Sequence, residues 1–223
     1  MKNRVLVVAP HADDETLGCA GTIFRHKLKK DETHFLLVSE LEENSKNILL
    51  KKKYSSQIKD IIKFYNFKTS HRLNLVATKL DTYPKSFLIE KISNVLKKVK
   101  PNIIYIPFAG DAHSDHNDVF QATSSCIKWF RYPYIKEVLV YETLSETNFS
   151  PSTTSLNFKP NVYKNITKYL NKKLKAVDIY KTEFKKHPFP RNKKVVESLA
   201  LLRGSESGFK YSEAFILLKN IQN

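Results

Sequence analysis

The chain has 223 residues, of which 41% are hydrophobic, and 38 lysines and arginines against 22 aspartates and glutamates give it a formal net charge of +16. This length and composition predict one globular domain over residues 1–223 and exclude a low-complexity chain. The charge favours an acidic partner, which would be nucleic acid, an anionic lipid surface or a phosphorylated substrate.

The first part of the chain alternates apolar runs with helical patterns. Strands are predicted where β-forming residues cluster, at residues 4–9, 33–39, 73–76, 102–107 and 138–141. Helices are predicted where apolar residues recur at helical spacing, at residues 16–30, 46–65, 85–99 and 116–130. Strands that are apolar on both faces and alternate with helices are typical of a parallel sheet covered on both sides. The pattern therefore predicts an α/β, Rossmann-like fold with a mostly parallel sheet and helices on both faces.

The second part of the chain is more polar. Residues 145–159 are rich in Ser, Thr and Asn and predict a long loop over the functional site. Residues 165–185 predict one amphipathic helix, residues 192–203 predict another, and residues 211–218 predict a closing strand or a short helix.

Several features bear on where the protein works and what it binds. The first apolar run, Val5 to Ala9, is too short for a signal-peptide core or a membrane span, which favours a cytoplasmic protein. Two cysteines, Cys19 and Cys126, indicate buried thiols and no disulfide framework. The lysines are spread along the chain without an aromatic and basic module, so solvated helix faces explain the charge better than nucleic-acid binding does.

Two groups of ionisable residues follow predicted strands. The sequence His11-Ala12-Asp13-Asp14 follows the first strand, and Asp111-Ala112-His113-Ser114-Asp115-His116 comes shortly after the strand at 102–107. Ligands of open α/β sheets bind beyond the carboxyl ends of the strands. Two histidines and one carboxylate with an open fourth position are typical of a catalytic zinc site, where the metal lowers the pKa of its bound water to roughly 7. The two groups therefore predict a metal site at the C-terminal edge of the sheet.

Each group alone has a simpler explanation. Asp13 or Asp14 could cap the next helix, and a single loop histidine is usually a solvated surface residue. If both simple explanations held, two ligand-rich groups would lie at strand ends by chance, which is much less common than either case alone. The remaining histidines show no such clustering and are expected on the surface or in packing; they are His26, His34, His71 and His187.

The segment PHADDETLGCAGT, residues 10–22, resembles the first signature of the LmbE-like, or PIG-L, zinc-dependent de-N-acetylase family, and HSDH at 113–116 resembles its second. The closing segments KKLKAVDIYKTEF and YSEAF are also similar to the family, so the resemblance covers nearly the whole chain. It implies a hydrolase that removes the N-acetyl group from a glucosamine-type sugar.

The resemblance also implies a role for each residue of the two signatures. His11, Asp14 and His116 would bind Zn²⁺, although the same ligand set suits Fe²⁺. Asp13 would be the general base that takes a proton from the metal-bound water. His113 would stabilise the oxyanion, and Asp115 would orient His113 and keep it protonated.

The chain departs from the family pattern at a few positions. Ala12 and Ala20 replace residues that are usually Pro and Gly. Tyr54 and Gln57 stand approximately where the family often has Arg-x-x-Glu, which puts substrate contacts from that helix in question. The segment LVSELEEN also lacks the family's glycine-containing turn.

The predicted substrate is an N-acetylated amino-sugar conjugate, joined to a nucleotide, a lipid pyrophosphate or another acidic group. Two alternatives remain from the sequence alone. One is a non-catalytic sugar-binding relative, and the other is a basic nucleic-acid-binding protein, which would show a steep salt dependence of affinity. No nucleic acid and no transmembrane segment are expected, and a homo-oligomer is left open.

Overall fold

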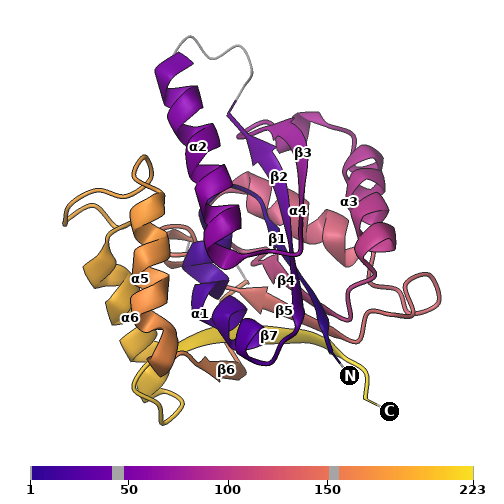
Figure 1. The fold of residues 1–223 in the computed structure, drawn as a ribbon. Coiled ribbons are helices and arrows are strands. Elements are labelled where there is room, and N and C mark those ends of the chain that lie inside the picture. Colours follow the sequence, from indigo (N-terminus) through magenta and orange to yellow (C-terminus); the bar gives the residue numbers. More distant parts are fainter. Residues whose placement is uncertain (1, 42–47, 151–155, 223) are drawn as a thin grey trace.

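The computed structural model describes residues 2–41, 48–150 and 156–222. Their strands form a seven-stranded sheet in the order β3-β2-β1-β4-β5-β7-β6 (Figure 1). The strands are β1 (Arg4–Ala9), β2 (Glu32–Glu40), β3 (Thr69–Val76), β4 (Ile103–Pro107), β5 (Glu137–Tyr141), β6 (Val162–Asn165) and β7 (Ser212–Asn220). Strands β1 to β5 pair in parallel, whereas β7 is antiparallel to both β5 and β6. The predicted α/β fold with a mostly parallel sheet is confirmed.

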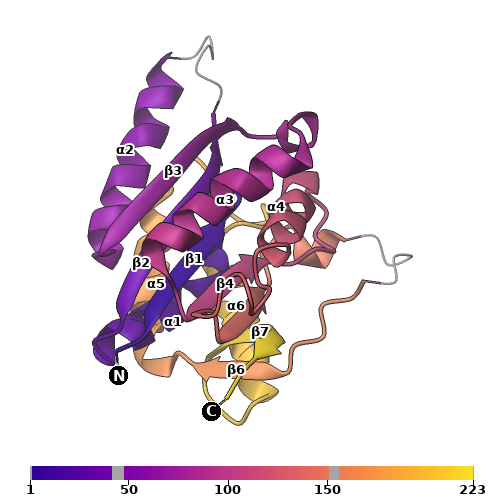
Figure 2. The ribbon, with the colours of Figure 1, turned by 90° about the vertical axis from the view of Figure 1, so that its right-hand side faces the viewer.

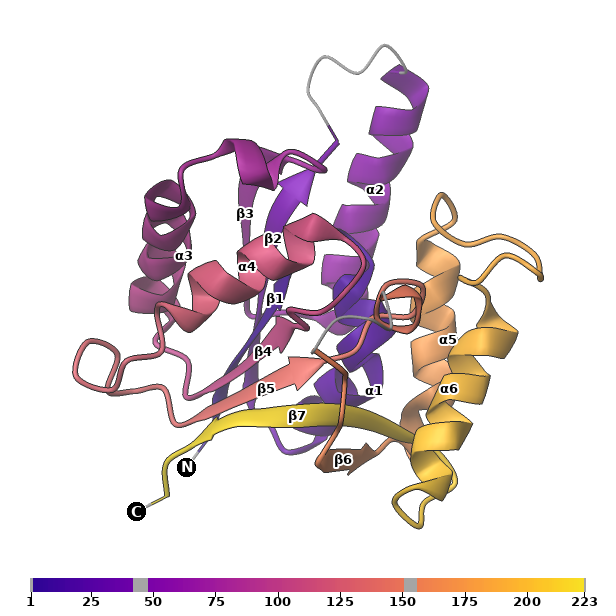
Figure 3. The ribbon, with the colours of Figure 1, turned by 180° about the vertical axis from the view of Figure 1, so that it is seen from behind.

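Helices cover both faces of this sheet (Figures 1 and 2). One face carries α1 (Asp14–Leu28), α2 (Ile48–Tyr65) and α5 (Leu170–Ile179), and the other carries α3 (Lys85–Val99) and α4 (Ser114–Ser124). Helix α6 (Lys193–Ser205) lies beside α5, as Figure 3 shows from behind. Short 3₁₀ turns complete the described elements: η1 (Leu80–Thr82), η2 (Thr147–Phe149) and η3 (Thr167–Tyr169).

Strand β1 shows why the sheet is apolar on both faces. Val5 and Val7 pack in the core under α1, α2 and α5, whereas Leu6 and Val8 pack in the core under α3 and α4. All four side chains are fully buried, because successive residues of a strand point to opposite faces and both faces are covered.

The direction in which successive strands are added to the sheet reverses between β1 and β4. The chain moves outward from β1 to β2 and β3, returns through α3 to β4 on the other side of β1, and continues to β5. The carboxyl ends of β1 and β4 therefore lie next to each other at a topological switch point, where α/β sheets bind their ligands.

The predicted element boundaries hold for β1 and α3 and shift elsewhere. Helix α1 begins at Asp14 instead of Thr16, and β3 begins four residues before the expected position 73. Helix α4 ends at Ser124 instead of near Phe130, because the chain then turns and buries Cys126 in the core. The beginning of the helix predicted at 46–65 and the middle of the loop predicted at 145–159 lie outside the described residues.

The single helix predicted at 165–185 is wrong at both ends. Residues up to Asn165 belong to β6, which pairs with β7. Helix α5 ends at Ile179, because Tyr180 leaves the helical conformation and is fully buried, donating a hydrogen bond from its hydroxyl to Glu15 at 2.9 Å. The closing segment is the strand β7.

Two sequence expectations concern the chain as a whole. Cys19 and Cys126 are both free and buried, as expected. Among the described residues, no helix has the length and apolar character that crossing a bilayer requires.

A buried ion pair fastens α1 to the end of the sheet. Lys173 of α5 donates to a carboxylate oxygen of Glu213 on β7 at 2.8 Å and to the carbonyl of Leu17 at 2.7 Å. The same carboxylate accepts from the backbone N–H groups of Gly21 and Thr22 at 2.9 and 2.8 Å. These bonds satisfy both buried charges and connect α1, α5 and β7.

Glu213→Gln should destabilise the fold by about 3–5 kcal/mol, because it leaves the Lys173 ammonium buried without a counter-charge. Asp178→Asn is the matched control, since the Asp178–Lys193 pair is about half exposed, and it should cost roughly 0–1 kcal/mol. Denaturant unfolding measures both. Equal losses in the two variants would contradict the role assigned to the buried pair.

Candidate metal centre

The turn from β1 to α1 carries the first group of ionisable residues. Asp13 occupies the position before α1 with a positive φ of 131°, a strained conformation for a residue with a side chain. Its N–H points to the carboxylate of the fully buried Glu15 at 3.3 Å, and Glu15 also accepts from the hydroxyl of Thr16 at 2.6 Å. Asp14 and Glu15 lie in the first turn of α1, where the helix dipole favours negative charge.

Close packing brings this turn down onto the sheet. A Cβ atom at Gly18 would lie 2.3 Å from the ring of Tyr141 on β5, and one at Gly21 would lie 2.4 Å from Ile166. Only glycine therefore fits at these two positions of α1 without displacing a buried side chain.

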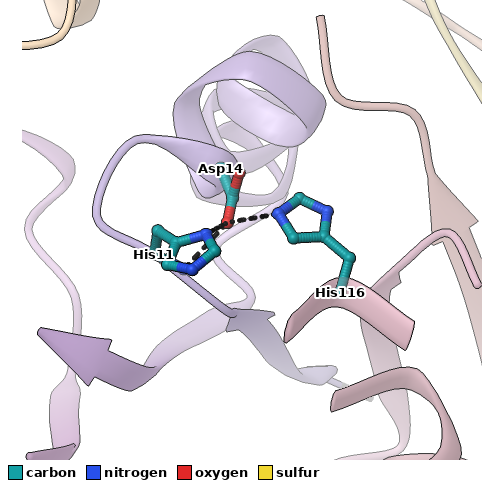
Figure 4. A group of neighbouring side chains, drawn as sticks. All are labelled: His11, Asp14 and His116. Atoms are coloured by element: carbon teal, nitrogen blue, oxygen red, sulfur yellow. Dashed lines mark hydrogen bonds and ion pairs between the residues drawn. The ribbon is translucent and has the colours of Figure 1, made fainter. Parts of the chain in front are cut away.

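His11, Asp14 and His116 converge at the switch point (Figure 4). His11 and Asp14 come from the β1–α1 turn, and His116 comes from the first turn of α4, after β4. One oxygen of Asp14 lies 3.5 Å from Nδ1 of His11 and 3.3 Å from Nε2 of His116. One potential ligand atom from each residue lies within 4.8 Å of the others, so the three side chains can surround a single ion.

Two further carboxylates hold the two imidazoles. Asp111 lies 2.7 Å from Nδ1 of His116, and Asp115 lies 2.8 Å from Nε2 of His11. Each histidine thus has one ring nitrogen fixed by a carboxylate and the other turned towards Asp14, which is the usual arrangement of metal-ligating histidines.

The donor set fits a divalent metal ion. Nε2 of His116 is buried and makes no hydrogen bond within the described part of the chain, although Asp14 is 3.3 Å away. A buried ring nitrogen without a hydrogen bond is costly unless another group binds it. Two imidazoles and one carboxylate are ligands suited to Zn²⁺ or Fe²⁺.

Charge coupling within this group is strong. Burial opposes the ionisation of Asp14, but the adjacent imidazoles of His116 and His11 hold the pKa of its carboxyl well below the usual range. Burial lowers the pKa of His116 and His11, but their carboxylate neighbours raise these values to about 10 and about 9. Protons therefore compete with a metal ion for the same nitrogen atoms.

His113 and Asp115 are placed differently from the expectation. His11, His113 and Asp115 form a second group whose ligand atoms also lie within 4.8 Å of one another. The Asp115 carboxylate accepts from the backbone N–H groups of Thr78 and Leu80, at 2.8 and 3.3 Å, as well as contacting His11. That Asp115 orients His113 and keeps it protonated stays a prediction: the Asp115 carboxylate contacts His11, whereas its backbone N–H contacts His113.

Burial and the nearby His11 lower the pKa of His113, which favours a neutral imidazole. Nδ1 of His113 accepts the backbone N–H of Asp115 at 3.2 Å, so the neutral ring carries its proton on Nε2. In its neutral form His113 can donate from Nε2, and its ring lies beside that of His11 with a centroid distance of 4.4 Å.

Asp13 has an arginine partner from a distant part of the chain. Nη1 of Arg191 donates to the Asp13 carboxylate at 2.9 Å, and Nη2 donates to Glu146 at 2.7 Å. Asp13 is nearly fully buried, and burial raises the pKa of its carboxyl well above the usual value, although Arg191 opposes this shift. Arg191 also donates to the hydroxyl of Ser145 at 2.7 Å, so it connects the loop after β5 to the site.

Tyr54 and Gln57 of α2 are both buried, so the positions where the resemblance implies an Arg and a Glu hold neutral side chains. Gln57 accepts a hydrogen bond from the hydroxyl of Thr182 at 2.9 Å and joins α2 to the segment after α5. Among the described residues, Arg191 is the cation that bonds Asp13, whereas Tyr54 and Gln57 bring no charge.

Comparison with known proteins bears on this geometry. The family profile described as PIG-L, GlcNAc-PI de-N-acetylase, matches residues 6–127, a stretch that contains both groups of ionisable residues. The chain belongs to the PIG-L family. The family assignment from the two signatures is thereby confirmed.

Relatives of this PIG-L protein cover almost its full length. A diacetylchitobiose deacetylase of Thermococcus kodakarensis is 22% identical over 227 residues, covering 98% of this chain and 84% of the relative. The conserved protein TT1542 of Thermus thermophilus has a similar structure, with a TM-score of 0.79 at 20% identity over 99% of this chain and 97% of the other. The N,N'-diacetylchitobiose deacetylase of Pyrococcus horikoshii, complexed with its inhibitor MPG, gives a TM-score of 0.77 at 19% identity, covering 96% and 83%. At these identities the solved structures establish the shared fold.

Sequence reasoning assigned no role to two side chains that contact the candidate metal centre. Asp111 belongs to the second group of ionisable residues. Its contact with His116 depends on how the buried His116 ring is oriented, which the sequence does not reveal. Arg191 lies 178 residues from Asp13 in a segment that carries no motif, and only the folded structure brings the two together.

His116→Ala should remove most of the bound metal, because it deletes one of three converging ligands, whereas His113→Ala should retain it. Elemental analysis of the freshly purified variants measures this directly. Retention of a near-stoichiometric ion in His116→Ala, with its loss in His113→Ala, would instead place the metal in the group of His11, His113 and Asp115.

Asp111→Asn should weaken metal affinity about 10–100-fold, because it removes the carboxylate that fixes the His116 ring. Titration of zinc into metal-free protein measures the effect. Asp118→Asn is the matched control, since Asp118 lies on the same helix and does not bond His116. Similar zinc affinities in the two variants would show that Asp111 does not support the metal site.

Proposed function

We propose that this PIG-L protein is a metal-dependent de-N-acetylase that hydrolyses the N-acetyl group of an amino-sugar conjugate and releases acetate and a free amine. The observation that carries the proposal is the convergence of His11, Asp14 and His116 at the switch point, with Asp13 beside them. The ion is proposed to be Zn²⁺, with Fe²⁺ as the alternative that suits the same ligands. The family and the deacetylase relatives support this class of reaction.

Amide hydrolysis needs a nucleophile, a base, stabilisation of the oxyanion and a proton for the leaving nitrogen. When bound, the metal ion supplies Lewis-acid polarisation of the carbonyl and a water molecule of lowered pKa. Asp13 is the proposed base: its raised pKa suits proton acceptance, and Arg191 holds the carboxylate in one orientation. Protonated Asp13 can then return that proton to the leaving amine.

His113 is proposed to stabilise the developing oxyanion. As a neutral imidazole with its proton on Nε2, it can donate one hydrogen bond to the carbonyl oxygen. Asp115 is proposed to act on His11, where its carboxylate fixes the ring, while its backbone N–H sets the tautomer of His113. This assignment differs from the role that the resemblance implies for Asp115.

The sugar carrier and the cellular location are part of the same proposal. A glucosamine-type sugar is proposed as the substrate, as the relatives' names indicate for those proteins, and the net charge of +16 suits an acidic carrier. A single domain over residues 1–223 and a cytoplasmic location remain predictions.

Acetate release from a panel of N-acetylamino sugars tests the function, and the panel should include N,N'-diacetylchitobiose and nucleotide-linked N-acetylglucosamine. Asp13→Asn should keep the metal and lower kcat by about 10²–10⁴-fold, the usual contribution of proton transfer. Asp60→Asn, on the exposed face of α2, is the control and should leave the rate unchanged.

Two outcomes would contradict the proposal. Joint loss of metal and activity in Asp13→Asn would make Asp13 a metal ligand. Absence of acetate release from every sugar of the panel by metal-loaded protein would favour a non-catalytic sugar-binding relative.

A further inference from the structure

A basic pocket of about 840 Å³ opens between the end of α5 and the beginning of α6. The segment that connects the two helices forms much of its wall. The charged residues of the lining are five lysines and one aspartate: Lys181, Lys185, Lys186, Lys193, Lys194 and Asp178. A volume of this size is typical of small-molecule sites.

Most of the positive charge in the basic pocket has no counter-charge. Asp178 pairs with Lys193 at 2.6 Å. For the other four lysines of the lining, the structure records no ion pair within residues 2–41, 48–150 and 156–222. An anion bound in the pocket would supply the counter-charge that these ammonium groups lack.

The first turn of α6 adds to this field. Helix N-termini carry partial positive charge and are usually followed by acidic residues. Helix α6 instead begins with Lys193 and Lys194, and its first turn contains no acidic residue. Asn192 caps the helix by accepting the backbone N–H of Val195 at 3.1 Å, so the cap itself brings no negative charge. The helix dipole and the lysines therefore favour the same kind of ligand.

Two consecutive residues link the basic pocket to the candidate metal centre. Arg191 bonds Asp13 in the metal centre, while the next residue, Asn192, lines the basic pocket. The backbone N–H of Lys185 donates to the carbonyl of Arg191 at 3.1 Å, which holds both sides of the connecting segment together. Figure 1 shows this segment as the orange loop above α5, and the metal centre follows β1 and β4, which run parallel to β2.

We propose that the basic pocket binds the phosphate or diphosphate group of the amino-sugar conjugate. This inference rests on the proposed function, since the N-acetyl group of the same conjugate would be hydrolysed at the metal centre. Lysine ammonium groups act as mobile point charges. They therefore select for negative charge but do not distinguish a nucleotide from a lipid as the group that carries the phosphate.

Binding of inorganic pyrophosphate, measured by calorimetry on the metal-loaded protein, tests the pocket directly. Lys185→Gln/Lys186→Gln should weaken binding about tenfold, the scale expected for two partly exposed charged contacts. Lys97→Gln/Lys98→Gln removes the same charge from the exposed side of α3 and should bind as the parent does. Equal affinity in all three proteins would overturn the proposal, because pyrophosphate held by the metal or by the overall field would not distinguish them.

A second measurement distinguishes the two sources of phosphate. Sedimentation with phosphatidylcholine vesicles that contain phosphatidylinositol, compared with phosphatidylcholine alone, reports a lipid carrier. Binding to the mixed vesicles that is lost in Lys185→Gln/Lys186→Gln supports a lipid-linked phosphate. Pyrophosphate binding that depends on these lysines without vesicle binding supports a soluble conjugate.

Activity separates this inference from the proposed function. The ratio of kcat/KM for nucleotide-linked N-acetylglucosamine to that for diacetylchitobiose should fall about tenfold in Lys185→Gln/Lys186→Gln and remain unchanged in Lys97→Gln/Lys98→Gln. If Lys185→Gln/Lys186→Gln deacetylates with an unchanged ratio and an unchanged affinity for pyrophosphate, the anion-binding role of the basic pocket is wrong and the proposed function stands. Lysine-dependent pyrophosphate binding without deacetylation of any sugar would overturn the proposed function and leave the anion site in place.

Discussion

The parallel pairing of β1 with β4 is the constraint on which the site depends. Val5, Leu6 and Val7 lie beside Ile103, Ile104 and Tyr105, so the loops that follow the two strands leave the sheet side by side. A one-residue slip of this register would turn every core side chain of β1 to the opposite face. The register between β1 and β4 therefore sets where the two loops that carry His11 and His116 begin.

Ionisable groups can accumulate at this edge only because each one has a partner. Asp111 and Asp115 hold imidazoles, Glu15 accepts from hydroxyl groups, and Asp13 is paired with Arg191. A buried polar group without a partner costs several kcal/mol, so removal of one member destabilises its neighbours as well. The strained backbone at Asp13 belongs to the same network, since the Glu15 carboxylate faces the N–H of that residue.

Local patterns predicted the part of the fold that local residues determine. Strand β1 and helix α3 lie where apolar periodicity placed them, and the two histidine-containing groups lie at adjacent strand ends. Helix α5 was predicted too long, because Tyr180 leaves the helix to reach Glu15, 165 residues away in the chain. The interaction of Asp115 with His11 could not be predicted either, since HSDH places Asp115 near His113 in sequence, whereas the fold presents its carboxylate to the other loop. Arg191 belongs to the same class of long-range contacts, for which the sequence carries no local signal.

The bonds from Glu213 to α1 have a consequence for synthesis of the chain. Helix α1 follows directly from the first strand, yet the carboxylate that accepts from Gly21 and Thr22 is made 192 and 191 residues later. Arg191 likewise reaches Asp13 across 178 residues. A ribosome-bound chain that already contains both histidine groups therefore still lacks the contacts that fasten the first helix and orient Asp13. Completion of the site therefore waits for Arg191 and Glu213, long after the residues of both histidine groups have been translated.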